Sequence, residues 1–198
     1  MNSIIKKSFA IIDREFGPHD FRPEEYAIIR RIIHSTADFE FKDLIRFSPD
    51  AIESAIAALR SDVPVITDVN MVKHGIVGML SKNFSKSPIA AIEFAPEAPP
   101  NKTRCEIGMV KCWEKFPEAI FVVGNAPTAL QALCEQISKT GISPALVIGA
   151  PVGFVSVIES KAALAQLPVP QIRIEGRKGG SPVAAAILNA LIVLAAES

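Results

Sequence analysis

The fold is indicated most clearly by residues 119–130, AIFVVGNAPTAL. The first five of these residues are apolar without a polar break, a pattern typical of a strand that is buried on both faces of a sheet. Gly124 and Pro127 then mark a turn, and a helical pattern follows them. A buried strand that leads through a tight turn into a helix is the repeating unit of parallel α/β folds.

The same arrangement recurs on both sides of this stretch. Further short apolar runs lie at residues 63–67, 89–94, 145–148 and 171–174, and helical patterns separate most of them. Strands that alternate with helices form parallel sheets through right-handed crossover connections. The sequence therefore predicts an α/β fold, a single domain over residues 1–198, with a mostly parallel, five-stranded sheet and helices on both of its faces.

Both ends of the chain are predicted to be helical. Residues 3–16 place apolar side chains at helical spacing, and a proline followed by two glutamates begins a second helix at residues 23–35. A third helix follows Pro49, and residues 183–196 form a buried apolar helix that is too short to span a bilayer. The N-terminal helices are expected to pack against the sheet or against a partner subunit.

The composition is typical of a folded globular protein, and its net charge would not attract polyanions such as nucleic acids. Of the 198 residues, 49% are hydrophobic, and 21 basic side chains balance 21 acidic ones. This zero net charge gives no support for a nucleic-acid or membrane partner. The first residues are too polar for a signal peptide, and the three cysteines form no C-x-x-C pair, so we expect free thiols and a cytoplasmic protein.

Four predicted strand-to-helix junctions are rich in Gly, Pro, Asn and Ser: residues 68–75, 124–130, 149–154 and 176–181. Glycine lets the backbone approach a ligand closely, and the N–H groups at a helix start bind anions. Each junction alone is explained as well by an ordinary turn. Because strand ends meet at one edge of an α/β sheet, four such junctions favour a shared binding site. A nucleotide site is a weaker alternative, since neither G-x-G-x-x-G nor G-x-x-x-x-G-K-[ST] occurs.

His34 is the strongest candidate for acid–base chemistry. It lies in the last turn of the second predicted helix, where the negative helix end favours the imidazolium, and Asp38 could hold the other ring nitrogen. Such a pair would poise a proton donor, whereas a histidine that only stabilises the helix end is the alternative. His74 is a second candidate, and His19 is expected at the surface. Three scattered histidines without a Cys/His cluster predict no metal site in the protein.

A further candidate group begins the helix that follows the proline-rich loop of residues 94–101. Thr103 is expected to cap this helix, and Arg104 would then point from the helix start towards the strand ends. There it could bind a carboxylate through two parallel hydrogen bonds. The alternative is an arginine that is simply solvated.

Taken together, these motifs resemble the precorrin-8X methylmutase family, which includes the cobalt-precorrin-8 methylmutases. The matching strings are specific as a set, above all GNAPTAL at residues 124–130 and PVGFV with ESK within residues 151–161. They run in order through nearly the whole chain: residues 8–12, 31–34 with Asp38, 68–75, 103–104, 124–130, 146–155, 159–161, 176–177 and 179–181. One stretch departs from the family pattern, because CEIG at residues 105–108 stands where small residues and alanines are usual.

The resemblance implies an isomerase, a homodimer with a flavodoxin-like or Rossmann-like α/β core. It implies a methyl shift from ring carbon 11 to ring carbon 12 of precorrin-8X or cobalt-precorrin-8, which gives hydrogenobyrinic or cobyrinic acid in cobalamin biosynthesis. No separate cofactor is implied, and any cobalt belongs to the substrate; the residues do not distinguish the metal-free from the cobalt-bearing form. The alternatives are a non-catalytic corrinoid carrier, against which the presence of His34 counts, and a protein that binds a nucleotide or acyl-phosphate.

The resemblance also assigns roles to individual residues. His34 matches the catalytic histidine, which protonates the ring-C region of the macrocycle, and Ser8 and Arg104 match positions that line the same pocket. A flat apolar ring edged with carboxylates needs an apolar floor, backbone N–H groups and a few cations at its rim. The expected substrate-binding residues are Ser8, Asp38, Met71, Thr103, Arg104, Asn125, Arg177, Gly180 and Ser181.

Overall fold

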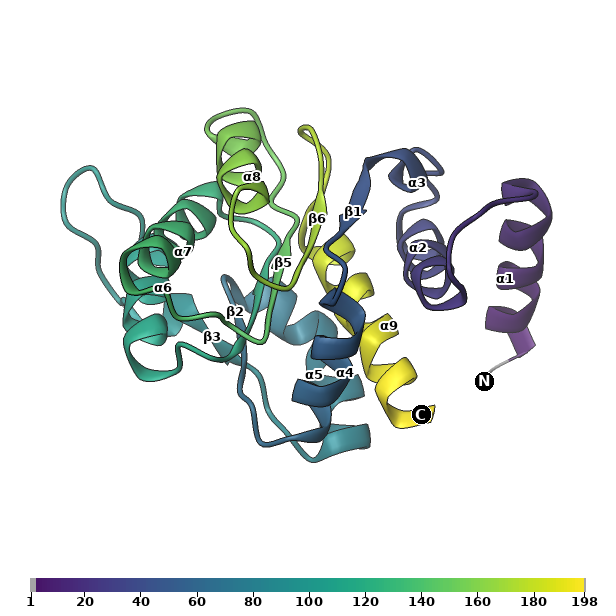
Figure 1. Cartoon of the computed structure of the whole chain (residues 1–198), viewed down its shortest axis with the longest axis horizontal. Helices are drawn as coiled ribbons and strands as arrows, with labels where there is room; N and C mark the ends of the chain where they lie inside the picture. The colour runs from purple at the N-terminus through teal and green to yellow at the C-terminus, as the bar shows by residue number, and fades with distance from the viewer. Residues whose placement is uncertain (1–2, 198) are drawn as a thin grey trace.

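A β-sheet runs through the middle of the molecule, with helices on both sides (Figure 1). The computed structural model describes residues 3–197. Within them the sheet contains β1 (Ile45–Phe47), β2 (Val65–Thr67), β3 (Ile89–Ala90), β4 (Ile120–Val123), β5 (Leu146–Gly149) and β6 (Gln171–Ile174). The strand order is β1-β6-β5-β4-β2-β3, and every neighbouring pair is parallel except β1 with β6. The α/β fold and the mostly parallel sheet are confirmed.

The predicted number of five strands is one too small, because β1 was not predicted. This edge strand has three residues and carries a charge at its centre, so it shows no apolar run. Arg46 of β1 stands opposite Arg173 of β6 in the antiparallel register. Glu175 lies between the two like charges, with its carboxylate 2.8 Å from Arg46 and 3.7 Å from Arg173. The strand is thus held by partners that are distant in the sequence.

The predicted strand at residues 89–94 is correct only over its first two residues. After β3 the chain turns into the 3-10 helix η1 (Ala91–Phe94). The N–H of Ile92 donates to the backbone oxygen of Asp68 at 3.3 Å, so η1 is fixed to the end of β2. A side chain at Gly108 would collide with the carbonyl group of Ala91. This glycine lets the following helix pack directly on η1.

The helices form two layers with separate hydrophobic cores. One core lies among α1 (Ser3–Phe16), α2 (Pro23–Thr36), α3 (Phe41–Leu44), α4 (Ala51–Arg60), α5 (Asn70–Phe84) and α9 (Ser181–Glu197). The other lies under α6 (Arg104–Lys115), α7 (Pro127–Thr140) and α8 (Val157–Ala165), on the opposite face of the sheet. The prediction of helices on both faces is therefore confirmed. The three predicted N-terminal helices correspond to α1, α2 and α4, and the short helix α3 was not predicted.

The C-terminal helix α9 lies between α2, α4 and α5 and has a mostly buried surface. Its small side chains allow close packing at two of the glycine-rich junctions. A Cβ atom at Gly75 would lie 2.8 Å from that of Ala185, and one at Gly124 would lie 2.9 Å from that of Ala184. Within residues 3–197 no helix is both long and apolar enough to cross a membrane.

The connections of the sheet place a crevice between β2 and β4. The five parallel strands have the spatial order β3-β2-β4-β5-β6, which is the order of flavodoxin-like doubly wound sheets. From β2 the chain moves outward to β3, then returns to the other side of β2 to form β4. Ligands of such sheets bind beyond the carboxyl ends of the strands at this switch point. The junctions after β2, β4, β5 and β6 all lie along that edge.

Candidate active site

A buried carboxylate fills the crevice at the switch point. Asp68 follows β2 directly and is fully buried. Its Oδ1 accepts hydrogen bonds from the N–H groups of Val69 at 3.0 Å and Gly124 at 3.2 Å. Its Oδ2 accepts from Asn125 at 2.7 Å and Ala126 at 2.8 Å. One side chain directly after β2 thereby fixes the turn between β4 and α7.

The β4–α7 junction is consequently not the open anion site that its sequence suggested. Burial raises the pKa of Asp68, and the four N–H groups that bind its oxygens act in the opposite direction. These N–H groups already have a partner, so they are not free to bind an anionic ligand. What the junction offers to a ligand is the exposed side chain of Asn125.

The junctions after β5 and β6 are bonded to each other. The N–H of Gly180 donates to the oxygen of Ala150 at 2.8 Å, and the N–H of Gly153 donates to the oxygen of Arg177 at 3.3 Å. Gly179 adopts φ 151°, and a side chain there would collide with the carbonyl oxygen of Ala150. The two loops therefore form one wall of the strand-end surface.

A buried lysine supports this wall from below. The Nζ of Lys161 donates to the oxygen of Gly176 at 2.8 Å and to that of Lys178 at 2.7 Å. Lys161 is only 3% exposed, and burial lowers its pKa to about 8. A neutral amine keeps two N–H donors, so both hydrogen bonds persist after deprotonation. Gly180 and Ser181 are buried in the same connection.

Lys161 makes the stability of the protein depend on pH in a predictable direction. The pKa is about 8 in the folded chain and ordinarily 10.5, so the unfolded chain binds more protons between these values and stability rises with pH across this window. Wild-type stability relative to Lys161→Met should therefore increase from pH 8 to pH 10.5, by up to about 3 kcal/mol. Urea unfolding of both proteins at several pH values measures this difference, and a constant difference would refute the assignment.

Apolar side chains are unusually exposed along this edge. Phe154 is 85% exposed and Val155 81% exposed in the β5–α8 connection, and Met71 at the start of α5 is 68% exposed. The guanidinium of Arg177 lies 5.7 Å from the ring centroid of Phe154. Large exposed apolar groups in one region mark a binding surface. With a cation beside them, they suit a flat apolar ligand that carries acidic groups.

Thr103 caps α6 as predicted. Its Oγ1 accepts the N–H of Glu106 at 3.1 Å. The same oxygen lies 2.7 Å from Oγ1 of Thr128, so a pair of hydroxyl groups joins the start of α6 to the start of α7.

Arg104 is exposed but partly engaged by its own chain. Its Nε donates to the oxygen of Ala95 at 2.6 Å and its Nη2 to the oxygen of Ile92 at 3.2 Å. The side chain thus holds the loop before α6, and within residues 3–197 the structure shows no hydrogen bond of its Nη1. Glu106, which departs from the family pattern, forms an ion pair with Lys102 at 2.9 Å.

His34 lines a cavity of about 280 Å³ between four helices. The lining residues are Ile5 and Phe9 of α1, Arg31, His34 and Ser35 of α2, Gly75 of α5, and Pro182, Ala185, Ala186 and Asn189 of α9. The imidazole packs edge-to-face on Phe9, with ring centroids 5.3 Å apart. Gly75 lies in the second turn of α5 and Pro182 in the first turn of α9, so one end of the cavity adjoins the strand-end edge. His34 is exposed and can reach a ligand there.

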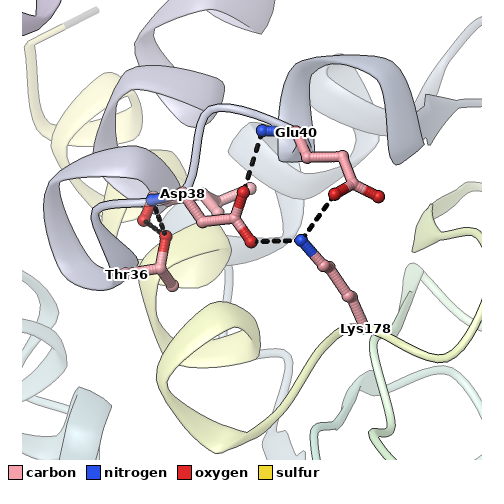
Figure 2. A network of polar contacts seen from close by, with 5 residues as sticks. Thr36, Asp38, Glu40 and Lys178 are labelled. Carbon is pink, nitrogen blue, oxygen red and sulfur yellow. Dashed lines mark hydrogen bonds and ion pairs between the residues drawn. The ribbon is translucent and has the colours of Figure 1, made fainter.

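The expected pairing of Asp38 with His34 is not found. Helix α2 ends at Thr36, and Ala37 adopts a left-handed conformation with φ 56°, which turns the chain away from the face of His34. Asp38 instead accepts a hydrogen bond from Lys178 at 2.6 Å, and Lys178 also reaches Glu40 at 2.7 Å (Figure 2). The ammonium of Lys178 lowers the pKa of Asp38. Asp38 therefore links the end of α2 to the β6–α9 loop.

The remaining candidates are Ser8, His74 and His19. The hydroxyl of Ser8 donates to the oxygen of Ile4 in its own helix at 3.0 Å, while its neighbours on α1 face the His34 cavity. His74 is exposed on α5. His19 is exposed and stacks on Tyr26 with ring centroids 4.2 Å apart. The residues from 3 to 197 contain no group of three or more His, Cys, Asp or Glu side chains that could hold a metal ion.

Sequence reasoning assigned no individual role to four residues that shape the site: Asp68, Lys161, Arg31 and Asn189. Asp68 and Asn189 gave a signal, since each is a polar residue next to or within an apolar run. Their partners lie far away in the sequence; the Asn189 amide, for example, donates to the oxygen of Gly75 at 2.9 Å. Such partners cannot be identified before the helices are placed in space.

Comparisons with known proteins agree on one family. The model of the family described as precorrin-8X methylmutase matches residues 3–194. The chain is 53% identical to a cobalt-precorrin-8 methylmutase of Synechocystis sp., over 97% of this chain and 95% of that protein. It is 36% identical to a precorrin-8X methylmutase of Sinorhizobium sp., over 96% and 93% of the two chains. A crystal structure of the precorrin-8X methylmutase from Thermus thermophilus superimposes with a TM-score of 0.89 at 43% identity, over 98% of this chain and 96% of that one. The chain therefore belongs to the precorrin-8X methylmutase family.

Proposed function

We propose that the chain is an isomerase of cobalamin biosynthesis. It moves a methyl group from ring carbon 11 to ring carbon 12 of precorrin-8X or cobalt-precorrin-8 and releases hydrogenobyrinic or cobyrinic acid. The observation that carries the proposal is the position of His34, an exposed imidazole at a cavity that adjoins the apolar strand-end edge. The names of its relatives support the same reaction.

The size of the cavity indicates how the substrate lies. Pockets for drug-sized ligands measure roughly 300–1,000 Å³. A tetrapyrrole acid is too large for a cavity of about 280 Å³, so the ring spreads over the exposed side chains of Met71 and Phe154 and places one edge at His34. The rim cations Arg104 and Arg177 then face the carboxylates at the ring periphery.

The reaction that this geometry supports is a rearrangement driven by proton transfer. His34 as an imidazolium donates a proton to the ring-C region, which increases the electron demand of the conjugated system. The methyl group migrates with its bonding electrons to the neighbouring carbon, and the proton returns to the imidazole. The substrate and product have the same atoms, so the proposal includes no separate cofactor, and any cobalt is part of the substrate.

We place the enzyme in the cytoplasm.

The proposal is tested with purified protein and both substrates. Incubation with precorrin-8X and, separately, with cobalt-precorrin-8 should change the absorption spectrum and give a product of unchanged mass with a new chromatographic position. A spectral shift without a new product would identify a carrier, and no change with either compound would exclude a corrinoid function. The ratio of the two rates shows which form the enzyme prefers.

We further propose that the protein is a homodimer. Helix α1 packs mainly against α2, yet Ile4 is 69% and Ile11 47% exposed on its outer side. Apolar side chains on an edge helix are typical of a subunit contact. Light scattering at micromolar concentration should report twice the mass of one chain, and Ile11→Glu should shift the protein towards the monomer. A wild-type monomer that is fully active would contradict the proposal.

A further inference from the structure

Lys161 is a buried cation that the proposed reaction does not use. It lies in α8 and is only 3% exposed, and burial is the cause of its lowered pKa. An ammonium group that is withdrawn from water is unfavourable unless its N–H groups find acceptors. The acceptors here are two backbone oxygens, of Gly176 at 2.8 Å and of Lys178 at 2.7 Å. Compared with an apolar side chain of the same length, Lys161 therefore adds two hydrogen bonds to the β6–α9 loop.

The two acceptors lie on either side of Arg177. The oxygen of Arg177 itself accepts the N–H of Gly153 at 3.3 Å, so three successive carbonyl groups of the loop are bonded. Gly176 and Gly179 adopt φ 69° and 151°, and glycine has many other conformations open to it once such bonds are lost. The side chain of Arg177 is exposed, so it projects into solvent from a backbone that is held in one conformation.

The same hydrogen bonds hold an aromatic side chain beside this cation. Phe154 follows Gly153, whose N–H is bonded to Arg177, and it is 85% exposed. The guanidinium of Arg177 lies 5.7 Å from the ring centroid of Phe154, within the range of a cation–π contact. Lys161 belongs to the helix that begins three residues after Phe154, so α8 supports both loops.

The loop is also attached on its other side, but less firmly. Figure 2 shows the ammonium of Lys178 between Asp38 and Glu40, with distances of 2.6 and 2.7 Å. All three side chains are partly exposed, and ion pairs in contact with water contribute little. The hydrogen bonds of Lys161 are shielded from water, where such bonds are stronger. Lys161 is therefore the main constraint on residues 176–178.

We propose that Lys161 is a positioning residue for the substrate, which it serves by holding Arg177 and Phe154 as a pair before the ligand binds. The inference rests on the proposed function and adds the group that prepares one part of the binding surface. Arg177 would meet one carboxylate of the macrocycle and Phe154 the adjoining apolar edge. Lys161 does not reach the ligand itself, since it is buried beneath the loop. A surface that is ordered in advance loses less conformational entropy on binding.

The test is a cycle of variants of the full-length protein, with cobyrinic acid as the titrated ligand. Lys161→Met keeps the length of the side chain and removes both hydrogen bonds, so binding should weaken by about 3- to 10-fold as the released loop must be ordered again. Arg177→Ala should weaken binding by about 10- to 100-fold, because a charge-assisted hydrogen bond is lost. In the Arg177→Ala background, Lys161→Met should add at most about a twofold effect.

Lys86→Met is the matched control. The ammonium of Lys86 also bonds to backbone oxygens, among them that of Leu59 at 3.0 Å, near the end of α4 and away from the strand-end edge. This variant should leave the dissociation constant of cobyrinic acid unchanged. A loss as large as that of Lys161→Met would show that affinity falls with any such lysine, and would overturn the positioning role.

The rate of conversion separates positioning from catalysis. At saturating substrate Lys161→Met should convert at nearly the wild-type single-turnover rate, because His34 is untouched and only the binding surface is loosened. A slower conversion with unchanged affinity would contradict the inference. So would equal losses of affinity from Lys161→Met in both backgrounds, since Lys161 would then not act through Arg177.

The inference stays testable even if Lys161→Met does not fold. Arg177 is exposed, so Arg177→Ala is expected to fold, and an unchanged affinity of that variant would leave Lys161 with no cation to position. If wild type binds no corrinoid, the proposed function fails together with the inference. If wild type binds and converts its substrate while Lys161→Met binds equally tightly, only the positioning role fails.

Discussion

His34→Asn and His34→Ala are expected to fold normally, bind the macrocycle and lose nearly all turnover. General acid catalysis by a positioned side chain contributes about 10²–10⁴ in rate, and neither replacement can deliver a proton. The side chain is exposed near the end of α2, so its removal should lower the free energy of unfolding by at most about 1–2 kcal/mol. Single-turnover conversion, measured beside the thermal melt and product binding, separates the two effects.

The opposite pattern would identify a structural histidine. In that case the melting temperature would fall while turnover per folded molecule stayed intact. Asp38→Asn serves as a matched comparison, because Asp38 bonds to Lys178 and not to the imidazole. We expect Asp38→Asn to keep most of the single-turnover rate, and a defect as large as that of His34→Asn would reject the assignment of roles.

Asp68→Ala is expected to have the largest effect on stability. The change removes the acceptor of four backbone N–H groups in a fully buried crevice. Each buried donor that is left without a partner costs about 1–3 kcal/mol, so we expect the free energy of unfolding to fall by about 3–5 kcal/mol even if water reaches some of them. Urea unfolding at pH 7 measures this loss.

Two further variants show whether the carboxylate itself is responsible. Asp68→Asn keeps one acceptor oxygen and should cost less than Asp68→Ala. Asp20→Ala removes an exposed carboxylate of the same kind and should leave the stability within about 0.5 kcal/mol of wild type. If Asp68→Ala unfolds at the same urea concentration as wild type, the β4–α7 turn is held by other contacts.

Much of the fold could be predicted because its strands are buried on both faces. Such strands, β4 for example, leave an apolar run in the sequence and are separated by helices. Strand β1 could not be predicted in this way, since it has three residues with a central arginine and pairs with β6, more than 120 residues later. The length of β3 was overestimated because η1 continues with apolar residues.

The site was predictable only where its signal is local. His34 stands at a recognisable helix end, and Thr103 has the spacing of a helix cap. The surroundings of His34 come from four helices and include residues of both ends of the chain, so no local pattern describes them. The pairing with Asp38 failed because it required α2 to continue beyond Thr36. A left-handed residue at position 37 redirected the carboxylate to Lys178.

The central claim is that this chain moves a methyl group within the macrocycle and that His34 supplies the proton. It is tested most directly with precorrin-8X that carries ¹³C in the migrating methyl group, followed by NMR during a single turnover. For wild type we predict that the labelled signal moves from the position of a methyl on ring carbon 11 to that of one on ring carbon 12, at unchanged mass. For His34→Asn we predict that the bound substrate keeps its original signal over the same time. A labelled methyl that stays in place with wild type, or that migrates equally fast with His34→Asn, would contradict the account.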